Sequence, residues 1–119
     1  MLFNLGAGDD GRAFLPCPYL GADVELSDER ERHIRNHHPD LLPDHHERII
    51  ETVGDPDQIR RSVRVGNAKL FSKWYADLRG SKHVVVVVVS DPGRKTQPWI
   101  ITSYLARKLK EGEIEWRKS

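Results

Sequence analysis

The sequence predicts an α+β fold in which two N-terminal helices are followed by a four-stranded antiparallel sheet. Two helix-start signals lie between residues 27 and 53, and four strand-like segments separated by turn residues follow them. The third observation is the unbroken run of valines from Val84 to Val89. This run is too apolar for a half-exposed strand and predicts a central strand covered on both faces. A short buried helix is the alternative.

The first helix is expected at about Asp28–His37. Ser27 offers a capping hydroxyl, and the acidic residues after it suit the positive end of the helix dipole. Pro39 disfavours helical backbone at His38, so the helix should stop there. A second helix is expected at about Pro43–Val53, because proline is favoured in a first turn and apolar residues then recur at helical spacing.

The strands are expected to form a meander. The segment Ile59–Val65 alternates in side-chain character, and the turn residues Gly66-Asn67 should join it to Lys69–Tyr75 as a hairpin. The valine strand follows, and Trp99–Leu105 is the fourth strand.

The chain of 119 residues has room for one domain with one main core. Residues 1–25 are rich in Gly, Asp and Pro and are expected to be an irregular lead-in, which could include a short edge strand at Arg12–Leu15 or Asp23–Leu26. Residues 26–119 are expected to form the single folded domain.

The net charge of +1 conceals a strong asymmetry. Residues 1–58 carry a net charge of −8, and residues 59–119 carry +9. The basic half contains the predicted sheet and indicates a polyanionic partner, with RNA as the leading candidate. The alternative is that the acidic helices neutralise the basic sheet within the fold.

The sequence also limits the cellular setting. No apolar run approaches the roughly 20 residues that span a bilayer, and the N-terminus lacks a signal peptide. We therefore expect a cytoplasmic protein with no membrane partner. The single cysteine, Cys17, excludes an internal disulfide and a cysteine-rich metal site.

Five of the six histidines lie within fourteen residues: His33, His37, His38, His45 and His46. Histidine transfers protons near neutral pH, so the cluster indicates acid–base chemistry, although each histidine alone could be a surface residue. His33 and His37 also have the spacing of a zinc-binding helix, which Asp40, His45 or His46 could complete. Ile34 stands where such zinc enzymes carry a catalytic Glu, so no metal or other cofactor is expected.

The predicted last strand places Thr102 and Tyr104 on one face. Hydroxyls beside an all-valine neighbour suggest a function, whereas the simpler explanation is that Thr is a good strand former. Arg107 and Lys108 follow the strand and could contact phosphate, although solvated lysines are as common in tails.

Residues 33–40, His-Ile-Arg-Asn-His-His-Pro-Asp, resemble the "His-Ile … His-Pro-Glu/Asp" motif of the phage-associated Barnase–EndoU–Colicin–RelE-like nucleases. The Pro-Asp turn at residues 55–57 and the strand Ile100-Ile101-Thr102-Ser103-Tyr104 also fit that family, as do Gly112 and Trp116. The resemblance covers about residues 24–117. It implies a RelE/barnase-like fold and a metal-independent endoribonuclease, which could act as a toxin held in check by an antitoxin or immunity protein.

Carried over to this chain, the resemblance implies that His33 and His38 match the motif histidines and that Thr102 and Tyr104 match the last strand. Ser103 stands where the family often has Ala, and His37 stands where Arg is common. The catalytic candidates are therefore His33, His38, Thr102 and Tyr104.

Candidates for substrate binding come from charge and position: His37, Arg61, Lys73, Tyr75 and Arg107. Tyr75 and Trp74 could stack on a base, although Trp74 could equally pack in the core. Two other functions remain open at this point. One is a non-catalytic module that binds nucleic acid or a partner, and the other is a His-ligated, metal-dependent hydrolase.

Overall fold

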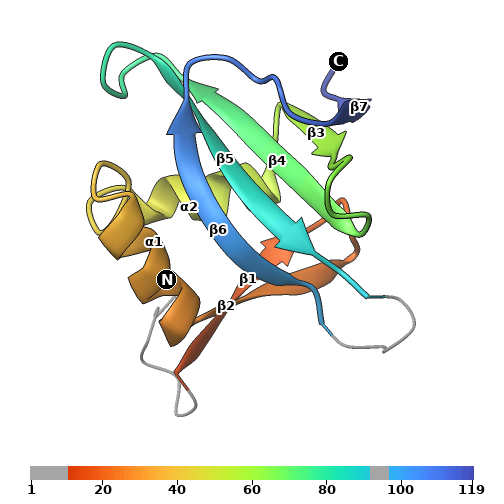
Figure 1. Ribbon diagram of the computed structural model, residues 1–119, viewed down its shortest axis with the longest axis horizontal. Helices are drawn as coiled ribbons and strands as arrows, with labels where there is room; N and C mark the ends of the chain where they lie inside the picture. The colour runs from red at the N-terminus through yellow and green to blue at the C-terminus, as the bar shows by residue number, and fades with distance from the viewer. Residues whose placement is uncertain (1–10, 92–96) are drawn as a thin grey trace.

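The computed structural model describes residues 11–91 and 97–119, which form one seven-stranded mixed sheet and two helices (Figure 1). The strand order across the sheet is β1-β2-β6-β5-β4-β3-β7. The elements are β1 (Arg12–Cys17), β2 (Ala22–Ser27), α1 (Asp28–His37), α2 (His46–Gly54), β3 (Gln58–Arg61), β4 (Ala68–Tyr75), β5 (Lys82–Val89), β6 (Trp99–Ala106) and β7 (Glu113–Arg117). Neither helix in this part of the chain is long and apolar enough to cross a membrane.

The predicted fold class, two N-terminal helices followed by a four-stranded antiparallel sheet, is wrong. The hairpin of β1 and β2 precedes both helices, β2 pairs in parallel with β6, and β7 adds an edge strand beside β3. Two strands therefore stand where an irregular lead-in with at most a short edge strand at Arg12–Leu15 or Asp23–Leu26 was expected, and residues 1–10 of that lead-in lie outside the described residues. The Gly, Asp and Pro content of the segment favoured a loop, but Pro16 is tolerated in an edge strand such as β1 because one side of that strand has no ladder to interrupt.

The first helix begins and ends where the sequence predicts. The Ser27 hydroxyl accepts a hydrogen bond from the Arg30 backbone N–H at 3.1 Å, and His38 is the C-terminal cap. The second helix begins at His46 rather than at Pro43. Residues 38–45 form turns instead of a first helical turn, and they bury Leu41 and Leu42 completely.

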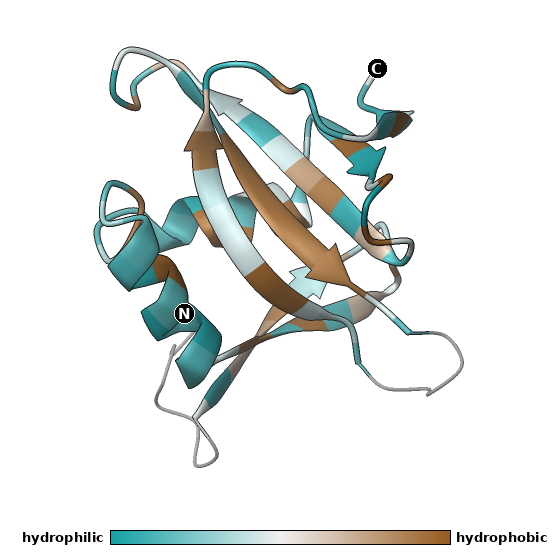
Figure 2. Cartoon of the chain, in the orientation of Figure 1, coloured by the Kyte–Doolittle hydropathy of each residue, from teal (hydrophilic) through white to brown (hydrophobic). Residues whose placement is uncertain are grey.

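The valine run is strand β5 and lies inside the sheet between β6 and β4 (Figure 2). Val84, Val86 and Val88 belong to the core that α2 covers. Val85 and Val89 point to the other face and are also buried. The prediction of a central strand covered on both faces is confirmed for these positions.

The predicted hairpin of β3 and β4 forms, but β3 is shorter than expected and ends at Arg61. The Ser62 hydroxyl accepts hydrogen bonds from the backbone N–H groups of Arg64 and Val65, each at 3.1 Å. Such local side-chain bonds compete with a strand ladder. Val63, expected to continue the strand, is consequently 68% exposed in the turn.

The connection from β6 to β7 crosses the sheet, because β7 pairs with β3 at the far edge. Figure 1 shows this segment passing beyond the ends of β5 and β4. We call residues 107–112 the crossover segment. Gly112 ends it with φ of +79°, and a Cβ placed there would lie 2.5 Å from the Arg61 carbonyl oxygen. Only glycine fits this close approach.

Candidate functional site

The face of the sheet turned away from α2, here called the open face, carries a groove with a volume of about 380 Å³. Its floor comes from three neighbouring strands, because Ser72 lies opposite Val85 and Val85 lies opposite Tyr104. The crossover segment forms one wall with residues 108–111. This volume falls within the range of sites that bind small molecules. We call this cavity the open-face groove.

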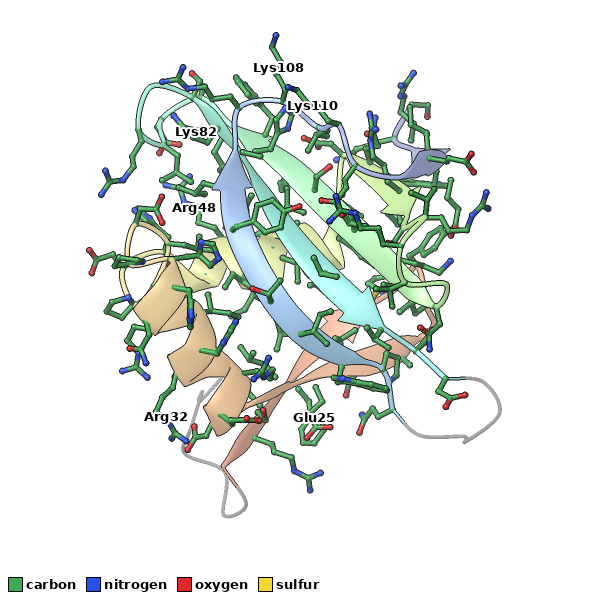
Figure 3. The ribbon with its side chains drawn as sticks, viewed as in Figure 1. Glu25, Arg32, Arg48, Lys82, Lys108 and Lys110 are labelled. Carbon is green, nitrogen blue, oxygen red and sulfur yellow. The ribbon has the colours of Figure 1, made fainter. Side chains whose placement is uncertain are left out.

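Four cations line the open-face groove: Arg60, Arg64, Lys108 and Lys110. Within residues 11–91 and 97–119, none of the four forms an ion pair with a carboxylate. The Arg60 guanidinium instead donates to neutral oxygens, the Gln58 side chain at 2.7 Å and the Gly112 carbonyl at 3.4 Å. Lys108 and Lys110 project above the end of the sheet in Figure 3. A set of unpaired cations around a groove favours an anionic ligand.

Tyr104 and Glu111 face the same groove from opposite sides, one on β6 and the other on the crossover segment. Burial raises the pKa of the Tyr104 hydroxyl, and the negative charge of Glu111 raises it further. Tyr104 is therefore protonated at neutral pH, and its hydroxyl can donate a hydrogen bond into the groove, although the raised pKa makes it a weaker acid than an ordinary tyrosine. Glu111 is the one carboxylate lining the described part of the groove.

His38 lies beside Tyr104, with 6.1 Å between the ring centroids. Its backbone is fixed by three hydrogen bonds. The His38 N–H donates to the Ile34 carbonyl at 2.7 Å, and the His38 carbonyl accepts from Leu41 and Leu42 at 2.9 and 3.2 Å. Since Leu41 and Leu42 are fully buried, the turn that carries His38 is anchored in the core.

Helix α1 brings His38 to this position because it lies along the edge of β6 (Figure 1). Strand β2 pairs with β6 only near Trp99, which leaves the rest of that edge without a neighbouring strand in the described structure. The Arg30 guanidinium donates to the backbone carbonyl of Ile101 at 3.3 Å and so ties the helix to the edge. The end of α1 therefore reaches the rim of the open face.

His33 and His37 form a stacked pair on α1, with ring centroids 4.2 Å apart. The Nδ1 of His37 lies 2.8 Å from the His33 carbonyl oxygen, the geometry of a hydrogen bond. Partial desolvation and the nearby positive charges of His37, Arg30 and His38 lower the pKa of His33. A neutral His33 ring near pH 7 is able to accept a proton.

Thr102 lies next to Tyr104 on the open face, opposite Val87. It lines a second cavity of about 270 Å³, which shares Tyr104, Arg64 and Glu111 with the open-face groove and extends it along β6. Ser103 points the other way, and its hydroxyl donates to the buried Val85 carbonyl at 2.7 Å. Ser103, at a position where the nucleases that the sequence resembles often have Ala, therefore bonds to the sheet backbone and does not face the groove.

Three predicted substrate contacts lie on the face that α2 covers. Arg61 pairs with Glu113 at 2.6 Å, and Lys73 donates to the Asp55 carbonyl at 2.9 Å. The Tyr75 hydroxyl donates to Glu51 of α2 at 2.5 Å. Arg107 is exposed just beyond β6 and does not line the groove. The structure thus brings together Tyr104, Thr102 and His38 but separates them from Arg61, Lys73 and Tyr75.

Of the four groove cations, sequence reasoning named only Lys108, and it missed Glu111. A signal for Arg60 was present, because Ile59 is buried and its strand neighbour Arg60 must then point to the other face. Lys110 and Glu111 had no such signal, because their position depends on the path of the crossover segment. No group of three or more His, Cys, Asp or Glu side chains within residues 11–91 and 97–119 is arranged to hold a metal ion.

Comparisons of the chain with protein-family models, with curated proteins and with solved structures give no match. The chemistry of the open-face groove is therefore the basis for a functional proposal.

Proposed function

We propose that the protein is a metal-independent endoribonuclease that cleaves RNA through attack of a ribose 2′-hydroxyl on the adjacent phosphorus. The observation that carries the proposal is the position of Tyr104, which lines a groove of unpaired cations and lies beside His38. A proton donor, a proton acceptor and a cluster of positive charge are the three components that this reaction needs.

The proposed reaction proceeds in one displacement. A base removes the proton of the 2′-hydroxyl as its oxygen attacks the phosphorus. The bond from phosphorus to the 5′-oxygen breaks, and that oxygen receives a proton from an acid. The products are a 2′,3′-cyclic phosphate and a free 5′-hydroxyl, and the reaction as written requires no oxidant or metal.

The residues of the site suit these roles. Tyr104 is protonated at neutral pH and lines the groove, so it is assigned the role of proton donor, and His38, whose ring centroid lies 6.1 Å from that of Tyr104, is assigned the role of proton acceptor. His33 lies on α1, the helix that His38 caps, and Thr102 can orient the substrate from the adjoining cavity. The Glu111 carboxylate is a second proton acceptor facing Tyr104. The groove cations would stabilise the charge that develops on the phosphoryl oxygens.

The proposal includes membership in the phage-associated nuclease family that the sequence resembles. A nuclease of this kind would damage the RNA of its own cell, so a toxin role implies a neutralising antitoxin or immunity protein. The acidic residues of such a partner would complement the cations of the open-face groove.

The test is to incubate RNA with the purified protein in EDTA, beside an oligonucleotide of the same sequence that carries 2′-deoxyribose throughout. We expect cleavage of the RNA only, with a 2′,3′-cyclic phosphate on the upstream fragment. Cleavage that requires added Zn²⁺ or Mn²⁺ would support a His-ligated hydrolase instead. Binding without cleavage would support a non-catalytic module.

A further inference from the structure

An aromatic pair made of the exposed Trp74 and the partly buried His83 lies on the open face beside the groove. Trp74 is 44% exposed, and its ring centroid lies 4.7 Å from that of His83, with the rings at 63° to one another. The two residues are partners in the ladder of β4 and β5. His83 is in turn opposite Ala106, which lines the groove.

Trp74 does not belong to the hydrophobic core of the described residues. Phe71, on the same strand, is completely buried on the covered face, and the adjacent Tyr75 is bonded to α2, whereas Trp74 points to the opposite face. The Trp74 backbone N–H donates to the Asp57 carboxylate at 2.8 Å, which fixes the strand at this point. A single exposed apolar residue is common on protein surfaces, so the position of Trp74 matters more than its exposure.

Trp74 and His83 belong to a row of cross-strand neighbours that runs parallel to the row forming the groove floor. It lies two residues along the strands from the Ser72–Val85–Tyr104 row, a separation of about 7 Å. A stacked nucleic-acid strand advances about 3.4 Å per nucleotide, so this distance corresponds to one or two nucleotides. Burial lowers the pKa of His83, the negative charge of Asp57 opposes this shift, and the positive charge of Arg60 adds to it, so both a carboxylate and a groove cation lie near the pair.

Proteins that bind single strands combine a cationic groove with aromatic side chains on which bases stack. We propose that Trp74, supported by His83, is a stacking subsite for an unpaired nucleobase adjacent to the phosphate bound in the open-face groove. The ligand class is therefore single-stranded RNA, because a duplex keeps its bases paired and stacked inside the helix. This inference rests on the proposed function and names the substrate class of the same site.

The test measures binding of two labelled oligomers by fluorescence anisotropy. One is a 2′-O-methyl uridine oligomer, which cannot be cleaved through its 2′-oxygen, and the other is an abasic oligomer with the same sugar-phosphate backbone. Trp74→Ala should weaken binding of the uridine oligomer by about tenfold and leave binding of the abasic oligomer unchanged. Trp74→Phe keeps a stacking ring and should lose much less affinity.

A second readout does not depend on a destabilising substitution. The uridine oligomer should quench the tryptophan fluorescence of the wild-type protein, and Trp74→Phe should remove that quenching while Trp99 and Trp116 remain. The subsite would be overturned if Trp74→Ala weakened binding of the uridine and abasic oligomers equally. It would also be overturned if Trp74→Ala left both affinities unchanged and the uridine oligomer did not quench the wild-type fluorescence.

These outcomes separate the subsite from the proposed function. Trp74-dependent binding of the uridine oligomer by a protein that never cleaves RNA would contradict the nuclease and retain the subsite. RNA cleavage that is equally efficient in Trp74→Ala and in the wild type would contradict the subsite and retain the nuclease.

Discussion

The rings of His38 and Tyr104 lie 6.1 Å apart between centroids, although one residue caps the first helix and the other lies on the sixth strand. No local feature of the chain forces this proximity. It results from packing α1 against the edge of β6 and from the buried Leu41 and Leu42 that anchor the turn after the helix. Tyr104 also lines the cationic groove, so it links the histidines to the candidate phosphate site.

Replacing His38 tests the acid–base assignment. His38→Ala should reduce RNA cleavage by about 10²–10⁴-fold, because one proton-transfer group is lost. Binding of a 2′-O-methyl RNA should be nearly unchanged. His45→Ala and His46→Ala, near the start of α2, are controls that should retain cleavage. Loss of cleavage in these controls but not in His38→Ala would place the site elsewhere.

Arg60 and Arg61 form a matched pair of adjacent arginines on opposite faces of the sheet. Arg60 lines the open-face groove, whereas Arg61 is paired with Glu113. We expect Arg60→Ala to weaken RNA binding by about tenfold and to reduce the slope of log affinity against log salt by about 1, the effect of one lost phosphate contact. In the same salt titration, Arg61→Ala should leave the RNA affinity and the salt slope nearly unchanged. Equal effects of the two variants would contradict the assignment of the open face.

Gly112 is predicted to be required for the crossover segment. Gly112→Ala should destabilise the fold by more than the about 1–2 kcal/mol of a left-handed alanine, because its Cβ would also press against the Arg61 carbonyl oxygen. Gly21→Ala is the matched control, since Gly21 has φ of +66° but no atom within 4 Å of the added carbon. Urea unfolding of the two variants measures the difference. Equal losses would show that the close contact relaxes without cost.

Stability should depend on pH through His83. Burial lowers the pKa of His83 from its ordinary value of 6.5, so the folded chain binds that proton less readily than the unfolded chain. The resulting stability is present above that value and is lost as the pH falls below it. His83→Asn should therefore show a smaller loss of unfolding free energy than the wild type between about pH 7.5 and 5.5. An unchanged loss would indicate that His83 titrates normally.

Local signals predicted α1, β4, β5 and β6 close to their observed bounds. Helix α1 follows from the Ser27 cap and the proline after His38, and β5 follows from the valine run. Strands β1 and β2 were predicted only as alternative short edge strands, because prolines and glycines around them are typical of loops. The parallel link between Glu25 of β2 and Trp99 of β6 joins segments distant in sequence, and no local pattern specifies such a pairing.

The residues of the candidate site also divide into those that local sequence patterns could place and those that they could not. Thr102 and Tyr104 could be placed on one strand face from alternation alone, and the structure puts both on the open face. The burial of Ile59 could have distinguished Arg60 from Arg61. Glu111 could not be found, because its approach to Tyr104 depends on a crossover that spans several strands.

The central claim is that Tyr104 is the proton donor of an RNA-cleaving groove. The most direct measurement is the single-turnover cleavage rate of Tyr104→Phe at saturating RNA, with its affinity for a 2′-O-methyl RNA measured in parallel. Removing one hydroxyl leaves the ring in place, so we predict a rate lower by about 10²–10⁴-fold and an affinity within about twofold of the wild type. A variant that cleaves RNA at the wild-type rate would contradict the account.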